Sequence, residues 1–161
     1  MIVRESILLR MGQRIEKVIK QQNFDDNFQK AVINLIYTSN YIKDYHAETF
    51  KRFDIQSQHF NILRILKGQN AKPASPGYIK NVMLDKGRDL TRLINKLVKN
   101  GWVHRQICAT NRRKIELTLT PKGISTIDRI SELLRDDEKK LRKMSEDEYE
   151  LLSNLLDKMR P

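Results

Sequence analysis

Residues 75–123 restrict the fold of this 161-residue chain more than any other segment. The segment opens with a short predicted helix that Ser75 caps and that begins at Pro76, where the missing N–H of proline leaves no helical hydrogen bond unmade. A second helix is predicted over 86–100, with Asp85 as its cap and an Asn-Gly pair at its end. Its apolar residues recur at helical spacing and are Leu90, Leu93, Ile94, Leu97 and Val98.

Two strand-like stretches follow this helix. Residues 102–109 and 114–120 alternate between apolar and polar side chains, and the polar residues 110–113 between them predict a hairpin tip. Thr120 and Pro121 then begin another helix, as its cap and its first-turn proline. Two short helices followed by a hairpin form a winged helix-turn-helix, in which one helix enters a DNA groove and the hairpin lies beside it.

Amphipathic helices are predicted on both sides of this segment, and Ser145 begins the last one with a capping box. Their expected ranges are 2–22, 26–50, 58–68, 121–143 and 146–158. The predicted fold class is therefore mainly α with a small β-hairpin wing (α+β).

We expect three parts within one compact chain. They are N-terminal helices for dimerisation and support over 1–53, a winged helix-turn-helix over 54–120, and C-terminal dimerisation helices over 121–161.

The positive charge is concentrated in about one quarter of the chain. The formal net charge is +11, and residues 75–114 hold ten Lys or Arg against two Asp, a net charge of +8. Clustered positive charge is what a polyanion-binding face requires, because each neutralised phosphate releases counterions. A solvated basic surface that only favours solubility is the alternative that charge alone leaves open.

The exposed face of the helix over 86–100 carries side chains that can bind DNA. We expect DNA contacts from Lys86, Arg88, Thr91, Arg92 and Lys96. An arginine can bond guanine O6 and N7 together, and a threonine can contact a thymine methyl group or a phosphate. The two lysines are expected at phosphates, which position a helix without specifying sequence. Asp89 is expected to pair with Arg92 rather than with a base.

An ordered set of motifs gives the segment a resemblance to the MarR family of transcriptional regulators. The stretch LTRLINKLVKNGWVHR, which begins at Leu90, resembles the family's recognition helix followed by a glycine, a hydrophobic residue and an arginine. The stretches NRR at Asn111 and LTPKG at Leu119 resemble the family's wing motif, Asp-x-Arg followed by a strand and Leu-Thr-x-x-Gly. The resemblance covers residues 54–125, and the terminal helices fit the layout of the family.

The resemblance assigns DNA contacts to the wing. Arg113 matches the arginine that enters the minor groove, where a narrow A·T tract concentrates negative potential. Arg112 and Lys114 are expected to contact the DNA backbone, and Asn111 is also expected at the DNA. Asn111 stands where the family has an aspartate, so it can accept a hydrogen bond but lacks the charge of a carboxylate. A charged hairpin tip that contacts no DNA is the alternative.

The resemblance also implies a homodimer, built by the terminal helices, that binds a near-palindromic operator in double-stranded DNA. The residues agree, because the apolar stripe over 3–18 and the apolar positions over 127–155 need a partner surface.

The family further implies a repressor controlled by a small aromatic effector in a cleft between the dimerisation helices and the winged domain. Tyr37, Tyr41 and Tyr45 recur at helical spacing and are the candidates to line that cleft, although such a row is also typical of a core.

Little in the sequence indicates an enzyme, a cofactor or a metal. Glycine-rich phosphate loops, G-x-S-x-G and paired carboxylates are absent from the sequence, so no catalytic site is expected. His46, His59 and His104 are scattered and form no ligand pattern. Cys108 has no second cysteine to pair with and is expected to be a plain strand residue.

The sequence predicts a cytoplasmic protein. It holds no run of about 18 apolar residues that would cross a membrane. Charged residues at Arg4, Glu5 and Arg10 interrupt the N-terminal apolar pattern, and a secretory signal would not carry them.

Two other functions remain open from sequence. A winged-helix module could instead bind nucleic acid without sequence preference, or a protein partner, and its affinity for DNA would then depend on salt but not on sequence. The other is a metal- or thiol-responsive regulator, whose operator affinity would respond to a chelator or to peroxide.

Overall fold

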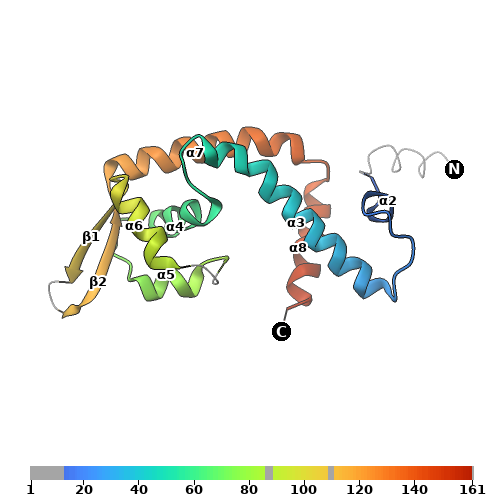
Figure 1. Cartoon of the computed structure of the whole chain (residues 1–161), viewed down its shortest axis with the longest axis horizontal. Coiled ribbons are helices and arrows are strands. Elements are labelled where there is room, and N and C mark those ends of the chain that lie inside the picture. The colour runs from blue at the N-terminus through green and yellow to red at the C-terminus, as the bar shows by residue number, and fades with distance from the viewer. Residues whose placement is uncertain (1–12, 86–88, 109–110, 161) are drawn as a thin grey trace. The chain divides into compact units, whose positions relative to one another are not determined.

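The computed structural model describes residues 13–85, 89–108 and 111–160, which are mainly helical with a two-stranded antiparallel sheet (Figure 1). The predicted fold class is confirmed. In chain order the elements are α2 (Ile15–Val18), α3 (Asn27–Lys51), α4 (Ser57–Gly68), α5 (Pro76–Val82), α6 (Leu90–Lys99), β1 (Val103–Cys108), β2 (Asn111–Leu119), α7 (Pro121–Leu141) and α8 (Glu146–Lys158). Within the described segments, none of the helices has the length and apolar character that crossing a membrane requires.

The chain divides into two compact units. The winged unit, Tyr41–Asp136, holds α4, α5, α6 and the β-hairpin, together with parts of α3 and α7. The terminal unit, Met1–Asn40 with Asp137–Pro161, holds α2, α8 and the remaining parts of α3 and α7. Both long helices therefore take part in both units.

An apolar core holds the winged unit together. It takes side chains from every helix of the unit and from the hairpin, as expected when each amphipathic element buries one face. The fully buried apolar side chains are Ile62, Leu63, Ile79, Ile94, Leu97, Leu117, Ile127 and Ile130. The predicted apolar spacing of α6 is confirmed at Leu93, Ile94 and Leu97, which are all buried.

The hairpin pairs β1 with β2, with Val103 opposite Leu119 and Ile107 opposite Ile115. The predicted tip over 110–113 is wrong in its extent, because β2 already begins at Asn111 and pairs it with Cys108. Pairing extends this far because ladder hydrogen bonds satisfy backbone groups that a longer tip would leave to water. Ala74 ties the hairpin to the start of α5, since its N–H donates to Leu117 O at 3.0 Å and its carbonyl accepts from Leu117 N–H at 2.9 Å.

Side-chain caps fix the starts of α5 and α6. Ser75 Oγ accepts from Tyr78 N–H at 3.1 Å, as predicted. For α6 the predicted cap is wrong: Asp89 Oδ1 accepts from Arg92 N–H at 3.2 Å, and the described helix begins at Leu90. Asp89 thus contacts Arg92 at the backbone, where its carboxylate satisfies an otherwise unpaired N–H. Asp85 instead accepts from Gln58 Nε2 at 3.1 Å.

The first turn of α7 docks on the turn between α6 and β1. Thr120 N–H donates to Trp102 O at 3.0 Å, and Thr120 Oγ1 donates to Gly101 O at 2.7 Å. Gly101 has φ 72°, the left-handed conformation that glycine adopts without steric cost. Gly123 lies so close that a Cβ there would be 2.0 Å from Trp102 O. The Leu-Thr-x-x-Gly motif thus fastens α7 to the end of α6 and the start of the wing.

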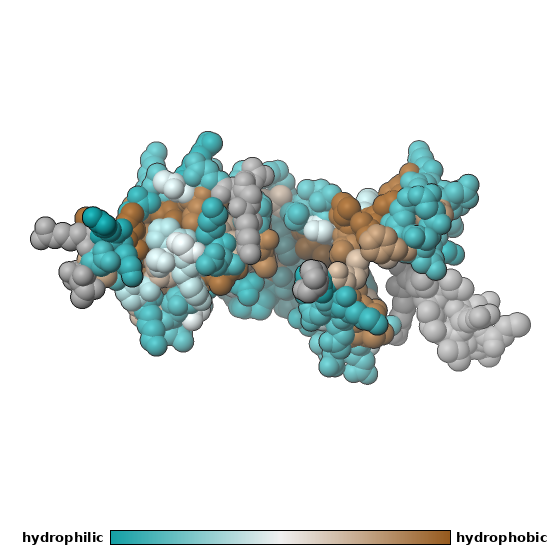
Figure 2. Space-filling model, turned by 90° about the horizontal axis from the view of Figure 1, so that it is seen from below, coloured by the Kyte–Doolittle hydropathy of each residue, from teal (hydrophilic) through white to brown (hydrophobic). Residues whose placement is uncertain are grey.

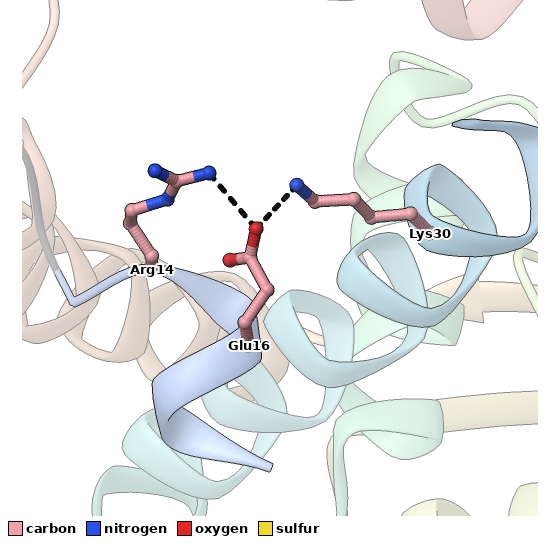
Figure 3. A network of polar contacts seen from close by, with 3 residues as sticks. All are labelled: Arg14, Glu16 and Lys30. Atoms are coloured by element: carbon pink, nitrogen blue, oxygen red, sulfur yellow. Dashed lines mark hydrogen bonds and ion pairs between the residues drawn. The ribbon is translucent and has the colours of Figure 1, made fainter. Parts of the chain in front are cut away.

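In the terminal unit, Glu16 joins α2 to α3. Its carboxylate accepts from Arg14 Nη2 at 2.9 Å and also pairs with Lys30 Nζ (Figure 3). The hydrogen bond from Lys30, followed by a backbone hydrogen bond, lowers the pKa of Glu16 to about 2. The pair with Lys30 thereby attaches the short α2 to the long α3, and Arg14 places a second cation on the same carboxylate.

The helix predicted over 2–22 is shorter than expected in its described part. It ends at Val18, and Lys20 has φ 55°. A residue in this left-handed conformation does not continue a right-handed helix. Residues 2–12 of that prediction lie outside the described residues.

Helix α8 of the terminal unit begins as predicted. Ser145 Oγ accepts from Glu148 N–H at 3.3 Å, and Glu148 Oε2 accepts from Ser145 N–H at 2.8 Å. This reciprocal pair is the capping box expected for α8.

We predict that Gly123→Ala lowers the free energy of unfolding by about 1–3 kcal/mol, because the added methyl group overlaps the Trp102 carbonyl, a backbone group that cannot move aside freely. Chemical denaturation of both proteins measures this difference. Gly68→Ala is the matched control, since a Cβ at Gly68 meets nothing within 4 Å. Equal losses in the two variants would show that the close approach at Gly123 does not matter.

Candidate nucleic-acid interface

The outer face of α6 is polar and exposed. Thr91 and Arg92 from the predicted set lie on this face, together with Asn95 and Lys99. They are exposed because the opposite face of the helix carries the buried Leu93, Ile94 and Leu97. The predicted contact residues Lys86 and Arg88 lie outside the described residues.

Lys96 occupies a different position from the outer row. Its Nζ pairs with Asp54 Oδ2 at 2.9 Å, across the turn between α3 and α4. The hydrogen bond and the charge of Lys96 lower the pKa of Asp54 below its usual value. Asp54 has φ 52°, which is a left-handed backbone conformation that few residues other than glycine adopt. The carboxylate that pairs with Lys96 is held on this unusual backbone turn. In this structure the Lys96 ammonium therefore links α6 to the body of the winged unit.

The described wing residues Asn111, Arg113 and Lys114 are exposed on β2. Asn111 Oδ1 accepts from the Arg113 N–H at 3.0 Å. An amide oxygen thus fixes the backbone two residues ahead, in the manner of an Asx turn. Arg112 belongs to β2, but its side chain lies outside the described part of the structure.

One face of the hairpin is turned toward the helices. Val103 and Leu117 are buried on this face, and Arg105 lies directly opposite Leu117 in the register. Arg113 lies between the paired residues Asn111 and Ile115, where the register of the hairpin shifts. Arg105 thus lies on the side of the wing that faces α6, and Figure 1 shows the hairpin beside that helix.

A hydrogen bond joins the wing directly to α6. Arg105 Nη2 donates to Asn95 Oδ1 at 2.7 Å. Neither residue was among the expected DNA contacts. Helical spacing from Arg92 could have placed Asn95 on the outer face, but Arg105 could be placed only once the strand register was known.

The winged unit also contains an open cavity of about 800 Å³ beside α6. The end of α3, the start of α4 and one side of α6 form its walls. Its ionisable lining residues are Lys43, Lys51, Asp54, His59, Asp89, Arg92 and Lys96, and Phe50 and Leu93 contribute apolar surface. Basic groups outnumber the two carboxylates, and both carboxylates already accept hydrogen bonds from α6. The cavity therefore favours an anion with an apolar body.

None of the three expected tyrosines is among the residues that line this cavity. Tyr37 lies in the terminal unit, and Tyr41 and Tyr45 lie in the winged unit with ring centroids 6.4 Å apart. Further ring contacts continue from Tyr45 through His46 to Phe50, which does line the cavity.

His59 lines this cavity from the first turn of α4. It is 5% exposed, and its Nδ1 accepts from Gln56 N–H at 3.1 Å. Burial, followed by the charge of Lys96, lowers the pKa of His59 below its usual value. The imidazole thus acts here as a neutral acceptor at the start of α4.

Cys108 sits in strand β1, half-buried. Hydrogen bonds from the Cys108 thiol and from Gln106 lower the pKa of Glu116 on the paired strand. Over the parts of the chain that the structure describes, no group of three or more His, Cys, Asp or Glu lies close enough together to hold a metal ion.

Comparison with known proteins relates the whole arrangement to one class of regulator. None of the protein-family models matches the chain. The HTH-type transcriptional regulator PecS of Dickeya dadantii is 29% identical over 86 residues, which cover 53% of this chain and 52% of PecS. The match thus spans about half the length of this curated relative.

Solved structures match over a larger share of the chain. Wild-type MarR from E. coli, in its apo form, is 30% identical with a TM-score of 0.61, covering 80% of this chain and 96% of that chain. A cysteine-to-serine variant of E. coli MarR in complex with operator DNA is 29% identical with a TM-score of 0.69, covering 85% of this chain and 100% of that chain. A MarR transcription factor from Planctomyces limnophilus is 29% identical with a TM-score of 0.65, covering 84% and 98% of the two chains.

Proposed function

Since this chain belongs to the MarR family of transcriptional regulators, we propose that it binds an operator sequence in double-stranded DNA as a homodimer, represses transcription there, and is released by a small aromatic effector. The observation that carries the proposal is the exposed polar face of α6 with the basic β-hairpin beside it. Arg105 of the wing bonds Asn95 of this helix, and Arg113 is exposed on β2 of the same hairpin. The operator complex of the related E. coli protein supports the same reading.

The chemistry of the two elements suits two grooves of DNA. The major groove admits an α-helix, and Arg92 and Thr91 offer a bidentate donor and a methyl-and-hydroxyl contact to base edges. Arg113 on the extended wing suits the narrow minor groove, and Lys114 suits a phosphate. Lys86, Arg88, Asn111 and Arg112 remain proposed contacts, and Lys96 reaches a phosphate only by leaving Asp54.

We predict that selection from a random DNA pool recovers a sequence with two related half-sites, and that Arg113→Ala weakens binding to it by about 1–3 kcal/mol. Fluorescence anisotropy measures both affinities. Arg135→Ala on α7 removes the same charge from an exposed site of the winged unit and serves as the control. A pool that yields no common sequence would support the module that binds nucleic acid without sequence preference.

Exposed apolar side chains support the homodimer. On α8, the exposed fractions of Leu151 and Leu155 are 59% and 53%, and on α3 that of Phe28 is 70%. Figure 2 shows such apolar residues in brown at the surface of the terminal unit, on the right of the view. Apolar surface on an amphipathic helix is stabilised by a partner, and a two-fold dimer would match two half-sites about 34 Å apart.

We predict that Leu151→Asp combined with Leu155→Asp converts the dimer into monomers in sedimentation-velocity experiments, because a carboxylate cannot be buried there without a partner charge. Ser153→Asp adds the same type of charge on an exposed position of α8 without removing apolar surface and should leave the dimer intact. A surviving dimer in the double variant would place the interface elsewhere.

The cavity beside α6 supports control by an aromatic acid. A carboxylate that enters it meets Lys43, Lys51 and Lys96, while Phe50 can contact an aromatic ring. Pairing with Lys96 would compete with Asp54 for the ammonium and so alter the support of α6. Such a ligand regulates DNA binding only if it favours a form of the dimer that fits the operator poorly. Tyr37, Tyr41 and Tyr45 do not line this cavity, and they stay a separate proposal for an effector site on α3.

We predict that millimolar benzoate, as a minimal aromatic carboxylate, weakens operator binding measurably and that Lys43→Gln reduces this effect without changing operator affinity in its absence. Competition binding with labelled operator measures both. An operator affinity that does not respond to any of a panel of aromatic carboxylates would remove this part of the proposal.

A further inference from the structure

We propose that Asn95 reads a base in the major groove and that Arg105 of the wing holds its amide in the reading orientation. The inference rests on the proposed entry of α6 into DNA and adds to it a specificity-determining residue and a positioning residue.

The location of Asn95 fits this role. It lies three residues after Arg92 and four before Lys99, so the three side chains follow one another along the outer face of α6. All three are exposed, while Leu93, Ile94 and Leu97 hold the opposite face in the core. Any approach of α6 to DNA through Arg92 therefore brings Asn95 to the groove as well.

The hydrogen bond from Arg105 settles which end of the amide faces the wing. A guanidinium has only donors, so the atom that it meets at 2.7 Å must be the carbonyl oxygen of Asn95. The Asn95 NH2 group is then the other end of the amide, and it has two hydrogens to donate. An unpaired asparagine would interconvert between the two orientations, whereas this one is held in a single orientation.

The position of Arg105 explains why it can do this. Its cross-strand partner is Leu117, which is fully buried and hydrogen-bonded to Ala74 through both backbone groups. Paired residues share one face of a hairpin, so Arg105 lies on the same face as the buried Leu117 and projects toward α6. The packing of Leu117 in the core fixes the position of the strand pair. The position of the wing therefore determines where the Arg105 guanidinium holds the Asn95 side chain.

The exposed donor group defines the class of base edge that Asn95 can read. In the major groove guanine offers N7 and O6, adenine offers N7, and thymine offers O4 as acceptors, whereas cytosine presents only its N4 donor. Asn95 should therefore favour a guanine, adenine or thymine at one position of each half-site and disfavour cytosine on the contacted strand.

The competing explanation is that the hydrogen bond only attaches the wing to α6. Asn95→Asp separates the two roles, because a carboxylate still accepts from Arg105 but presents an acceptor in place of the NH2 donors. A purely structural contact would survive this change without any effect on base preference. A reading contact would change its preference toward cytosine, whose N4 group donates.

The experiment is selection from a random DNA pool with the full-length wild type and the Asn95→Asp variant. Binding measurements on operators that carry each of the four bases at the affected position then quantify the change. We expect Asn95→Asp to select cytosine at one position of each half-site and to bind the wild-type operator about tenfold more weakly relative to the cytosine operator. Asn61→Asp is the matched control, since Asn61 Oδ1 also accepts a hydrogen bond, from Leu84 N–H at 3.0 Å, and the substitution adds the same charge.

Two variants of Arg105 test the positioning role. Arg105→Met removes the donor and should lose about tenfold of discrimination at that same position, whereas Arg105→Lys keeps a donor and should retain part of it. Loss of a phosphate contact would instead weaken binding to all sequences alike and reduce the salt dependence. Thermal unfolding checks that all the variants remain folded.

The outcomes distinguish a failure of the roles of Asn95 and Arg105 from a failure of the proposed function. If the wild type selects two half-sites and Asn95→Asp selects the same sequence, the reading role of Asn95 is overturned while the proposed function stands. If Arg105→Met keeps full discrimination, the positioning role of Arg105 is overturned. If the wild type selects no common sequence, the proposed function and this inference fail together.

Discussion

The close approach of α7 to the turn between α6 and β1 is the contact on which the rest of the winged unit depends. Gly123 lies against the Trp102 carbonyl, where an added Cβ would overlap the carbonyl oxygen, and Thr120 bonds both Trp102 and Gly101. These few atoms bring together the end of α6, the start of the wing and the start of α7. A shift of the turn between α6 and β1 would alter the angle between α6 and the hairpin, because both elements start or end at this turn.

The same constraint gives the candidate interface its shape. Leu117 is buried and its backbone is hydrogen-bonded to Ala74, so the position of the hairpin against the core is fixed. Arg105, which pairs with Leu117, is thereby directed toward α6. Arg105 reaches Asn95 only because both the strand and the helix are held in this way. On the other side of α6, Lys96 joins the helix to Asp54 and closes one wall of the cavity. The helix is thus supported on both flanks while its outer face stays exposed.

Much of the architecture could be predicted because it follows from local chemistry. Ser75 and Ser145 form the expected caps, and the buried residues of α6 follow the expected helical spacing. The errors arose where two local solutions compete. Asp85 and Asp89 can both cap a helix, and the structure uses Asp89, whose carboxylate lies three residues before the N–H of Arg92. The extent of the hairpin was also missed, because pairing across strands depends on a partner that a single strand does not reveal.

By itself, the sequence determined the succession of elements, the concentration of positive charge over 75–114 and the basic side chains on the outer face of α6. Helix caps and apolar periodicity act over a few residues and can be recognised from sequence alone. The tertiary structure alone decided that Lys96 pairs with Asp54, that Arg105 meets Asn95 and that a cavity opens beside α6. These contacts join residues from different elements. They depend on strand register and on the core that places the elements side by side, and local sequence patterns encode neither.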